Sequence, residues 1–563
     1  MDSQRLILFF VFSFSVFMLL DAWQREQQAA PSAPAARAKV EKPTTEGKAV
    51  PPADTQTVPT PSKPFPQALP KAAEPGLPVP AAGEGETVRV STDLLIAEVD
   101  RLGGTLKGVE FIKHKDSKDA SKNYVLLGAG HRYEAQSGIA GDAGPNQGTL
   151  WQAQPGERSL EPGRDTVELR LSAQGKDGLE VQKVYTFRRD SYVIDVSLEI
   201  RNSGATPVLS YAYFQFTHDG KPEANGDSFG QSFAVQSYTG FAVYSNERKF
   251  EKVQPSDLDK GKANHIKQAN DGWLAFVQHY FVSAWLPAEG VARESVLEKR
   301  QDGSYAGRLL VPIAVAPGAT SKVTVPLYAG PQEQEKLNKI APGLDLTVDY
   351  GWLTVIAVPL FWVLAWLNQW VGNWGVAIIL LTVIIKLLFY PLSAASYRSM
   401  GKMRVLAPKL QKLKERYGED RQRLQQAMME LYKTEKINPL GGCMPIVVQI
   451  PVFIALYWVL LASVELRHAP FVLWIDDLSA RDPWYILPIL MAGTMFVQTW
   501  LNPAPPDPVQ ARVMKIMPIV FSVFFFFFPA GLVLYWLVNN VLSIAQQWRI
   551  THVLERGAAP RKS

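Results

Sequence analysis

The chain has 563 residues, a formal net charge of +5, 47% hydrophobic residues and a mean hydropathy of -0.04. These averages are those of a soluble protein, and at about 150 residues per domain the length allows several domains. The single cysteine, Cys443, excludes a disulfide scaffold and a cysteine-based zinc cluster. The averages conceal an uneven distribution, because several apolar runs of bilayer-spanning length follow Gly351 and none lies between Glu86 and Pro331.

An apolar run from residue 6 to residue 20 follows the polar start of the chain. A run of this length is either the core of a cleaved signal peptide or an uncleaved signal anchor. Because no convincing cleavage site comes before Ala29–Ala30, we favour an N-terminal signal-anchor transmembrane helix at residues 1–23. Residues 24–86 are rich in proline and alanine, which opposes helices and sheet ladders, so we predict an extended, translocated linker there.

Period-two alternation of apolar and polar residues dominates the next part of the chain, for example at 166–172, 179–187, 192–200 and 321–328. Strands with this pattern predict a large antiparallel β-sandwich over residues 87–340. Its aromatics Tyr211, Tyr213 and Phe214 either line a cleft or belong to the core, and the core is the commoner place for such a pattern. No pair of acidic residues and no histidine cluster stands out in this domain.

Tryptophans mark the segment that follows the sandwich. They recur every four residues at Trp362, Trp366, Trp370 and Trp374, and Pro359 interrupts the apolar run. Because a tryptophan stripe suits the lipid headgroup boundary, we predict an interfacial amphipathic helix at residues 341–373. Residues 393–443 carry 11 Lys and Arg against 5 acidic residues and should be cytosolic, which requires a single crossing, at 374–392, after the sandwich.

Four further apolar runs lie at 444–464, 483–501, 513–528 and 531–548, with an external loop at 465–482 and a cytosolic loop at 502–512. With the anchor and the span at 374–392 they make six transmembrane helices, followed by a basic cytosolic tail at 549–563. The predicted fold class is therefore a polytopic α-helical membrane protein with a large antiparallel β-sandwich outside. Both termini are predicted to be cytosolic and residues 24–350 external.

The basic segment 393–443 has apolar residues at helical spacing on both sides of Gly418, which predicts a cytosolic helical hairpin. Such a hairpin either packs on the membrane and on itself or docks the acidic RNA surface of a ribosome. The expected ribosome and targeting contacts are its basic residues Arg398, Lys402, Arg404, Lys409, Lys412 and Lys414.

Polar residues inside the predicted spans are the candidate functional residues, because each is costly in a bilayer. Lys386 has Thr382 one helical turn before it, and its ammonium either reaches water at the cytosolic end or faces a hydrated cavity. Other polar groups either line the same cavity or tie helices together; they are Gln449, Asn539, Asn540, Ser543, Gln546 and Gln547.

Several chemistries have no sign in the sequence. There is no phosphate-binding loop, no zinc-protease or serine-hydrolase motif and no intramembrane pair of acidic residues. We therefore predict no enzymatic activity, no cofactor, no metal and no small-molecule substrate. A polytopic solute transporter or channel is the alternative, although inverted repeats are not evident. An external carbohydrate enzyme would need a carboxylate pair or a catalytic histidine in the sandwich, and no acidic pair or histidine cluster is evident there in the sequence.

Three long motifs point to one known family. They are Asn-Pro-Leu-Gly-Gly-Cys-Met-Pro at 438–445, the loop at 463–480 with Leu-Trp-Ile-Asp-Asp-Leu, and Phe-Pro-Ala-Gly-Leu-Val-Leu-Tyr-Trp at 528–536. The chain resembles the YidC/Oxa/Alb membrane protein insertases, of the Gram-negative type with a large periplasmic domain. The resemblance implies a supersandwich in the periplasm and a five-helix core in the inner membrane, which encloses a hydrophilic groove open to the cytosol and to lipid.

The resemblance also implies roles for residues and partners. A positive charge stands at the position of Lys386, where arginine is usual, and Thr382 and Trp536 fall at positions that contact the substrate. The expected substrate groove consists of Lys386, Thr382, Gln449, Trp536, Tyr535 and Asn540. The implied function is the insertion, folding and assembly of inner-membrane proteins, alone or with the Sec translocon. Implied partners are nascent membrane proteins, SecYEG with SecD/SecF, the ribosome, the signal-recognition-particle receptor and the lipid bilayer.

Overall fold

The computed structural model describes residues 86–116, 119, 121–141, 144–221, 238–417, 420–435, 444–502 and 508–558. The predicted signal anchor at 1–23, the linker up to residue 85, Cys443 and residues 559–563 of the predicted tail lie outside the described residues. The contacts discussed below join residues of one compact unit, which consists of Gly76–Pro503 and Lys515–Ser563.

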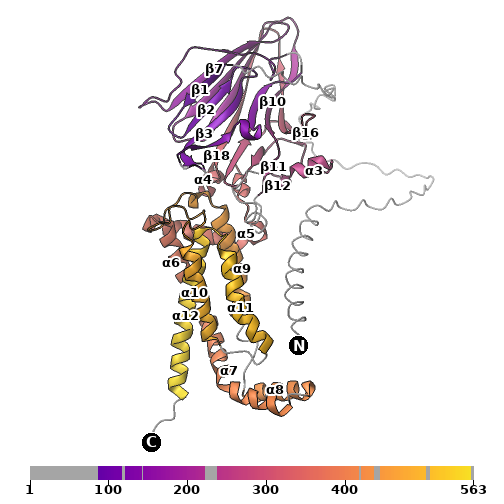
Figure 1. The fold of residues 1–563 in the computed structure, drawn as a ribbon. Coiled ribbons are helices and arrows are strands. Elements are labelled where there is room, and N and C mark those ends of the chain that lie inside the picture. The colour runs from indigo at the N-terminus through magenta and orange to yellow at the C-terminus, as the bar shows by residue number, and fades with distance from the viewer. Residues whose placement is uncertain are drawn as a thin grey trace, which may run out of the picture. The chain divides into compact units, whose positions relative to one another are not determined.

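Two sheets, each with nine strands in the described part of the chain, form a β-sandwich between residues 87 and 331 (Figure 1). The first sheet has the order β1-β2-β3-β5-β10-β17-β16-β13, with β4 paired to β3. The second has the order β12-β11-β14-β15-β18-β9-β8-β7-β6. Neighbouring strands pair in antiparallel fashion in both sheets, for example β10 with β17 and β8 with β9, so the predicted antiparallel sandwich is confirmed.

The strands of the first sheet are β1 (Thr87–Ser91), β2 (Leu95–Asp100), β3 (Thr105–Lys115), β4 (Asn123–Leu127), β5 (Glu134–Ile139), β10 (Val208–His218), β13 (Gln268–Ala269), β16 (Arg293–Lys299) and β17 (Tyr305–Val315). Those of the second sheet are β6 (Gln152–Ala153), β7 (Thr166–Gln174), β8 (Leu179–Arg188), β9 (Val193–Asn202), β11 (Gly240–Ser245), β12 (Lys249–Val253), β14 (Trp273–Val277), β15 (Phe281–Trp285) and β18 (Thr320–Pro331). Short helices connect some of them, namely η1 (Ala129–His131) and α3 (Pro255–Asp259).

The alternation seen in the sequence places one side of each strand in the core. In β7, Val167, Leu169 and Leu171 are buried, whereas Thr166 and Glu168 are exposed. Successive side chains of a strand point to opposite faces, so this pattern buries one apolar row against the other sheet. Each such side chain stabilises the fold by about 1.5–3 kcal/mol when it is fully buried.

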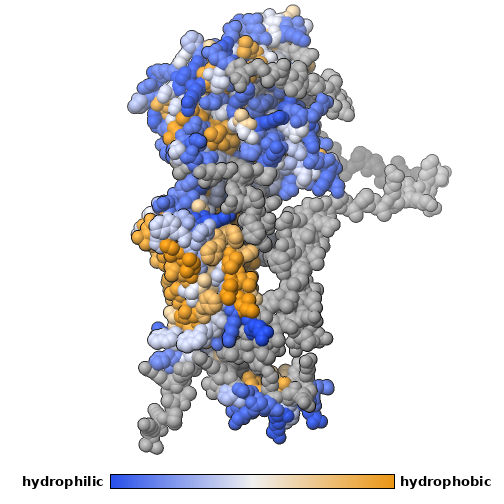
Figure 2. Space-filling model, in the orientation of Figure 1, coloured by the Kyte–Doolittle hydropathy of each residue, from blue (hydrophilic) through white to orange (hydrophobic). Residues whose placement is uncertain are grey.

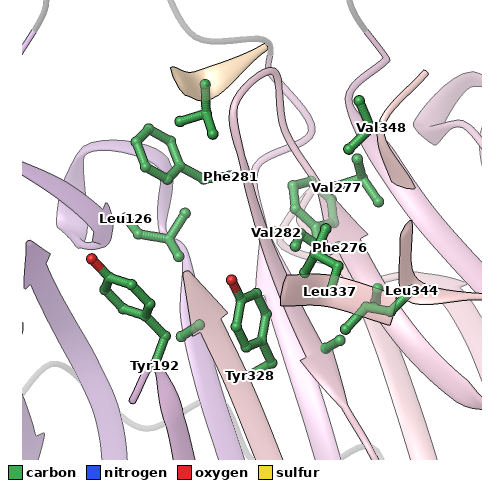
Figure 3. Close-up of a cluster of buried hydrophobic side chains, with 14 of the residues drawn as sticks. Leu126, Tyr192, Phe276, Val277, Phe281, Val282, Tyr328, Leu337, Leu344 and Val348 are labelled. Atoms are coloured by element: carbon green, nitrogen blue, oxygen red, sulfur yellow. The ribbon is translucent and has the colours of Figure 1, made fainter. Parts of the chain in front are cut away.

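Aromatic side chains fill much of the space between the sheets. Phe281 stacks on Tyr124 with ring centroids 4.1 Å apart, and Phe214 and Phe216 lie 5.2 and 5.5 Å from Trp285. Figure 3 shows Phe281 within a cluster that also contains Leu126, Tyr192, Phe276, Val277, Val282, Tyr328, Leu337, Leu344 and Val348.

Two of the three aromatics considered for a cleft are buried, but only Phe214 belongs to the core between the sheets. Phe214 is fully buried in the core, and Tyr213, on the opposite face of β10, is only 3% exposed. Tyr211 is half-buried. Two of the three side chains are therefore unavailable to a ligand, in agreement with the core interpretation.

The C-terminal part of the chain is helical. It starts with α4 (Gln334–Ile340) and the short helices η2 (Leu344–Thr347) and η3 (Gly351–Leu353). The longer helices are α5 (Thr354–Val371), α6 (Trp374–Leu388), α7 (Tyr390–Tyr417), α8 (Arg421–Thr434), α9 (Met444–Ala462), α10 (Ile486–Leu501), α11 (Pro508–Phe525) and α12 (Ala530–Ala558), with η5 (Val464–Leu466) after α9.

The span predicted at 374–392 is not one straight helix. The helix α6 ends at Leu388, and α7 follows after Phe389 with a bend of 65°. Pro391 explains the break, because proline has no N–H with which to continue the hydrogen-bond ladder, whereas it is accommodated in the first turn of a new helix. The prediction missed this break, and α7 then runs without interruption into the basic segment.

Length and composition allow some of these helices to cross a membrane. In the described residues Gly351–Val371 is long and apolar enough by itself, and the bent pair Trp374–Leu388 with Tyr390–Lys402 passes when taken together. Shorter apolar helices are Val448–Ala462, Ile486–Leu501 and Lys515–Phe525. Figure 2 shows hydrophobic side chains gathered over the helical region, whereas the visible face of the sandwich is mainly hydrophilic.

The helix α5 carries the tryptophan stripe. Trp362, Trp366 and Trp370 are 64%, 45% and 76% exposed, and Trp374 at the start of α6 is partly buried. The helix continues through Pro359 and packs on α6 and α9. Because this segment also has the length and composition of a span, its interfacial position stays a prediction.

Candidate functional site

The helix α12 supplies most of the polar candidates, and its start is held by the loop that precedes α10. The N–H of Ala530 donates to the carbonyl of Ala480 at 2.7 Å, and that of Gly531 donates to Leu478 at 2.9 Å. A side chain at position 531 would meet the Leu478 oxygen at 3.1 Å, so glycine allows this close approach. The loop therefore fixes the position from which α12 presents its polar face.

Lys386 lies in the last turn of α6 and points into the contact with α12. Lys386 is only 7% exposed, and its Nζ donates to Ser543 Oγ at 2.7 Å. Ser543 in turn donates to the carbonyl of Asn539 at 2.7 Å. Among the described residues no carboxylate pairs with Lys386. The ammonium therefore lies between helices, where Ser543 is its one partner in the part of the chain that the structure describes.

Amide groups join α12 to its other neighbours. The amide of Gln449 in α9 donates to Asn539 at 2.7 Å. The amide of Asn540 donates to the hydroxyl of Thr494 in α10 at the longer distance of 3.4 Å. Nearer the end of α12, the Gln547 amide donates to Asn502 at 3.0 Å. We name Lys386, Gln449, Thr494, Asn539, Asn540 and Ser543 the interhelical polar cluster. Its members come from four helices, so it forms only when these helices pack together.

Thr382 does not take part in the polar cluster. Its hydroxyl donates to the carbonyl of Ile378 in the same helix, at 2.7 Å, although the residue is buried on the same side as Lys386. Tyr535 is also buried, at 2% exposed, with its ring 6.2 Å from that of Phe453. Trp536 packs edge-on against Phe453 at 4.3 Å, and its indole N–H has no acceptor among the described residues. Tyr535, Trp536 and Phe453 form an aromatic wall beside the interhelical polar cluster.

The basic hairpin residues are mostly on the surface of α7. Arg398, Lys402 and Lys412 are exposed, and Lys409 pairs with Glu435 at 2.7 Å. Arg404 and Lys414 belong to the same helix, but their side chains lie outside the described residues. The exposed cations leave this helix able to meet an acidic surface.

Two features of the structure were not found from the sequence. Thr494 lies in α10 and Asn502 directly follows it, in a segment that showed no polar pattern, and the packing of α10 on α12 makes them partners of α12. The sandwich also contains a histidine cluster, formed by His131, His218 and Asp219. The expectation that this domain has none is therefore wrong, because the two histidines lie far apart in the sequence and strand pairing brings them together.

Comparison with known proteins identifies the family to which this chain belongs. The chain is 54% identical to the membrane protein insertase YidC of Methylobacillus flagellatus, over 100% of this chain and 99% of that protein. The chain belongs to the YidC family of membrane protein insertases. A second YidC insertase, from Nitrosospira multiformis, is 51% identical over 99% of this chain and 98% of that protein. The family resemblance seen in the sequence motifs is confirmed.

Two family models cover the sandwich and the helical part of this YidC-family chain and meet within α5. A model described as the YidC periplasmic domain matches residues 87–363, and one described as the 60Kd inner membrane protein matches residues 366–557. The chain is thus an inner-membrane protein with a periplasmic β-sandwich, and its family consists of insertases rather than enzymes. The solved structure "Active YidC insertase crystal structure with the first transmembrane domain resolved" covers 82% of this chain and 92% of that one, at 18% identity and a TM-score of 0.37.

Proposed function

We propose that this YidC-family insertase works by hosting the polar end of a substrate at the interhelical polar cluster while the substrate's apolar segment moves into lipid. The observation that carries the proposal is Lys386, a buried ammonium whose single described partner is the hydroxyl of Ser543, at 2.7 Å. A lysine at mid-membrane depth costs roughly 2.5–3.5 kcal/mol on insertion scales. A carboxylate in the external tail of a substrate recovers part of that cost when it approaches Nζ.

The amide pairs of the cluster support the same role. Gln449 with Asn539 and Asn540 with Thr494 are neutral hydrogen bonds, each of which contributes about 0.5–1.5 kcal/mol net. Exchange of such bonds for bonds to a substrate backbone or to water is therefore nearly neutral in free energy. A polar tail can pass between these groups without the full cost of a bare hydrocarbon environment.

The apolar route runs along α11. Many of its side chains are exposed and apolar; they are Ile516, Ile519, Val520, Phe521, Val523 and Phe524. A substrate helix that leaves water for lipid gains about 0.8 kcal/mol per buried CH2 group, and an acidic tail that moves outward gains about 2.3 kcal/mol per charge at 100 mV. These two terms supply the driving force without nucleotide hydrolysis.

The topology of the proposal has six spans, with the anchor at 1–23, both termini in the cytosol and residues 24–350 in the periplasm. The exposed cations of α7 support a cytosolic position for the hairpin, by the positive-inside rule. In this orientation Arg398, Lys402 and Lys412 face the ribosome or the signal-recognition-particle receptor. The sandwich faces SecD/SecF, and SecYEG delivers part of the clients.

The test is reconstitution of the purified protein in liposomes with Lys386→Glu. Insertion of a single-span substrate with a short acidic external tail should fall at least about tenfold, since two like charges now meet, and about tenfold corresponds to 1.4 kcal/mol. A substrate with a neutral tail should lose much less. Lys386→Arg keeps the charge and should retain activity.

The matched control is Lys402→Glu, which makes the same change of charge at an exposed site on α7. It should leave insertion of both substrates in liposomes unchanged. Normal insertion of the acidic-tail substrate by folded Lys386→Glu protein would refute the role of Lys386. Solute flux through proteoliposomes that contain the unchanged protein but no substrate, kept with Lys402→Glu and lost with Lys386→Glu, would instead identify a channel.

A further inference from the structure

His131, His218 and Asp219 meet at one end of the first sheet. His131 ends η1 in the connection between β4 and β5, and His218 is the last residue of β10, which pairs with β5. The N–H of Asp219 donates to the carbonyl of His131 at 2.9 Å, and the two imidazole rings are nearly parallel with centroids 5.6 Å apart. Two backbone segments far apart in the chain therefore hold the three side chains together.

The distances between the three side chains match a tetrahedral metal site. Asp219 Oδ1 lies 3.5 Å from His131 Nδ1 and 3.4 Å from His218 Nδ1, and all three candidate ligand atoms lie within 4.8 Å of one another. Zinc bonds of roughly 2.0–2.1 Å in tetrahedral geometry place neighbouring ligand atoms roughly 3.3–3.4 Å apart. Two of the three distances among these ligand atoms are thus close to the tetrahedral value already, and only the distance between the two histidine nitrogens must shorten.

One of the three candidate ligands, His131, gives an ion a path to the cluster. The His131 side chain is 34% exposed, which gives an entry path, and its buried Nδ1 has no hydrogen-bond partner among the described residues. Asp219 Oδ1 also accepts the N–H of Lys221 at 2.9 Å, which orients the carboxylate as second-sphere donors do.

One existing bond must be replaced. His218 Nδ1 accepts the N–H of Gly220 at 2.9 Å, and a metal would take that lone pair. Gly220 has φ of +73°, a conformation that a glycine leaves easily, so rotation of this peptide is the expected adjustment. The rings of Phe276 at 4.2 Å and Tyr133 at 5.0 Å pack on His218 and keep its imidazole in place.

We propose that His131, His218 and Asp219 bind a divalent transition-metal ion, with Zn²⁺ as the best match, and leave a fourth position for water. Two imidazole nitrogens and one carboxylate oxygen form a donor set that zinc accepts, whereas Mg²⁺ and Ca²⁺ prefer oxygen ligands alone. The ion would fasten the β4–β5 connection to the end of β10. The proposal is independent of the insertion mechanism, because it concerns the periplasmic sandwich and not the polar cluster.

The test is a calorimetric titration of Zn²⁺ into the full-length protein in detergent, after removal of any histidine tag and of bound metal. One equivalent should bind to the unchanged protein. Asp219→Asn and His131→Gln should each weaken that binding at least about tenfold, since loss of outer-sphere partners alone costs roughly ten- to hundredfold. His552→Gln, in the helix α12 and distant in sequence from the cluster, is the matched control and should bind as the unchanged protein does.

A second measurement uses the unchanged protein and therefore does not depend on whether the variants fold. Co²⁺ added to the unchanged protein should give the intense visible absorption of a four-coordinate ion, and Zn²⁺ should displace it. The weak spectrum of hydrated Co²⁺ would overturn the proposal whatever the variants show. Equal Zn²⁺ binding by the unchanged protein and by folded Asp219→Asn and His131→Gln proteins would also overturn it.

Discussion

The periplasmic sandwich and the helical core each bury a lysine, and they satisfy it differently. Lys183 of β8 is fully buried, and its Nζ donates to three backbone carbonyls, of Gly103 at 2.8 Å, Gly104 at 3.1 Å and Ser137 at 2.6 Å. It also lies 4.6 Å from the ring of Trp151. All three ammonium hydrogens have acceptors, so this lysine is saturated.

Lys386 has only one described partner for the same three hydrogens, the hydroxyl of Ser543. Two donors are therefore left for water or for a ligand, in a setting where an uncompensated charge is costly. In the proposed mechanism, this difference separates a structural from a functional buried charge. Lys183 links segments of the two sheets, whereas Lys386 is the group proposed to receive a substrate carboxylate.

Replacement of the saturated lysine should give the largest loss of stability. Lys183→Met keeps the volume but leaves the carbonyls of Gly103 and Ser137 without the lysine donor, at about 1–3 kcal/mol for each unsatisfied group, whereas the Gly104 carbonyl still accepts the Tyr185 hydroxyl. We expect about 2–6 kcal/mol of destabilisation, measured as faster hydrogen–deuterium exchange in the peptides that contain β5 and β8. The protein that remains folded should insert substrates normally.

The matched variant is Lys386→Met, which removes the same group from the undersatisfied site. No buried acceptor is orphaned there, because the Ser543 hydroxyl donates to Asn539, so stability should be unchanged or higher by up to about 2.5–3.5 kcal/mol. If Lys183→Met exchanges no faster than Lys386→Met, the distinction between the two lysines fails.

The stability of the sandwich should also depend on pH through Lys183, and this effect should be smaller than that of replacing the lysine. Burial lowers the pKa of Lys183 to about 7, from an ordinary value of 10.5. Between these two pH values the unfolded chain holds more protons than the folded one, so the stability of the sandwich should rise with pH across this window. The slope is at most about 1.4 kcal/mol per pH unit. Below pH 7 this lysine adds no pH dependence to the stability, because it is protonated in both the folded and the unfolded protein.

Denaturant unfolding at several pH values checks this expectation, with Lys183→Met as the reference that lacks the titrating group. The difference between the two curves should grow from pH 7 to about 10.5. A difference that stays flat, or shrinks as pH rises, would show that the three carbonyls keep Lys183 charged throughout.

The sequence predicted the elements of both regions better than their contacts. Alternation in β7 and β9 and the apolar runs of α9 and α10 locate these elements within a few residues, because period and composition are local properties. The polar face of α12 was also visible, since Asn539 and Ser543 recur at one-turn spacing.

The partners of those residues could not be predicted. Lys386 bonds Ser543 rather than Thr382, and Asn540 meets Thr494, because helix rotation and packing choose among several polar neighbours. The same limit applies to His131 and His218, which no spacing rule connects. The break after Leu388 is different, because Pro391 is a local signal that the sequence contains.

The smallest effect is expected from Ser543→Ala, which removes the one described partner of Lys386. Net loss of one hydrogen bond costs about 0.5–1.5 kcal/mol, and the freed ammonium can be hydrated instead, so folding should change little. Because the hydroxyl competes with a substrate carboxylate for Nζ, insertion of an acidic-tail substrate should become about two- to fivefold faster, which corresponds to roughly 0.4–1 kcal/mol.

The matched control is Ser522→Ala in α11, whose buried hydroxyl has the carbonyl of Pro518, in its own helix, as its one acceptor among the described residues. It removes the same atom from the same kind of environment and should leave the insertion rate unchanged. If Ser543→Ala instead slows insertion as much as Lys386→Glu does, then Ser543 positions the ammonium for the substrate. The undersatisfied lysine would then depend on its one neutral partner as strictly as Lys183 depends on its three carbonyls.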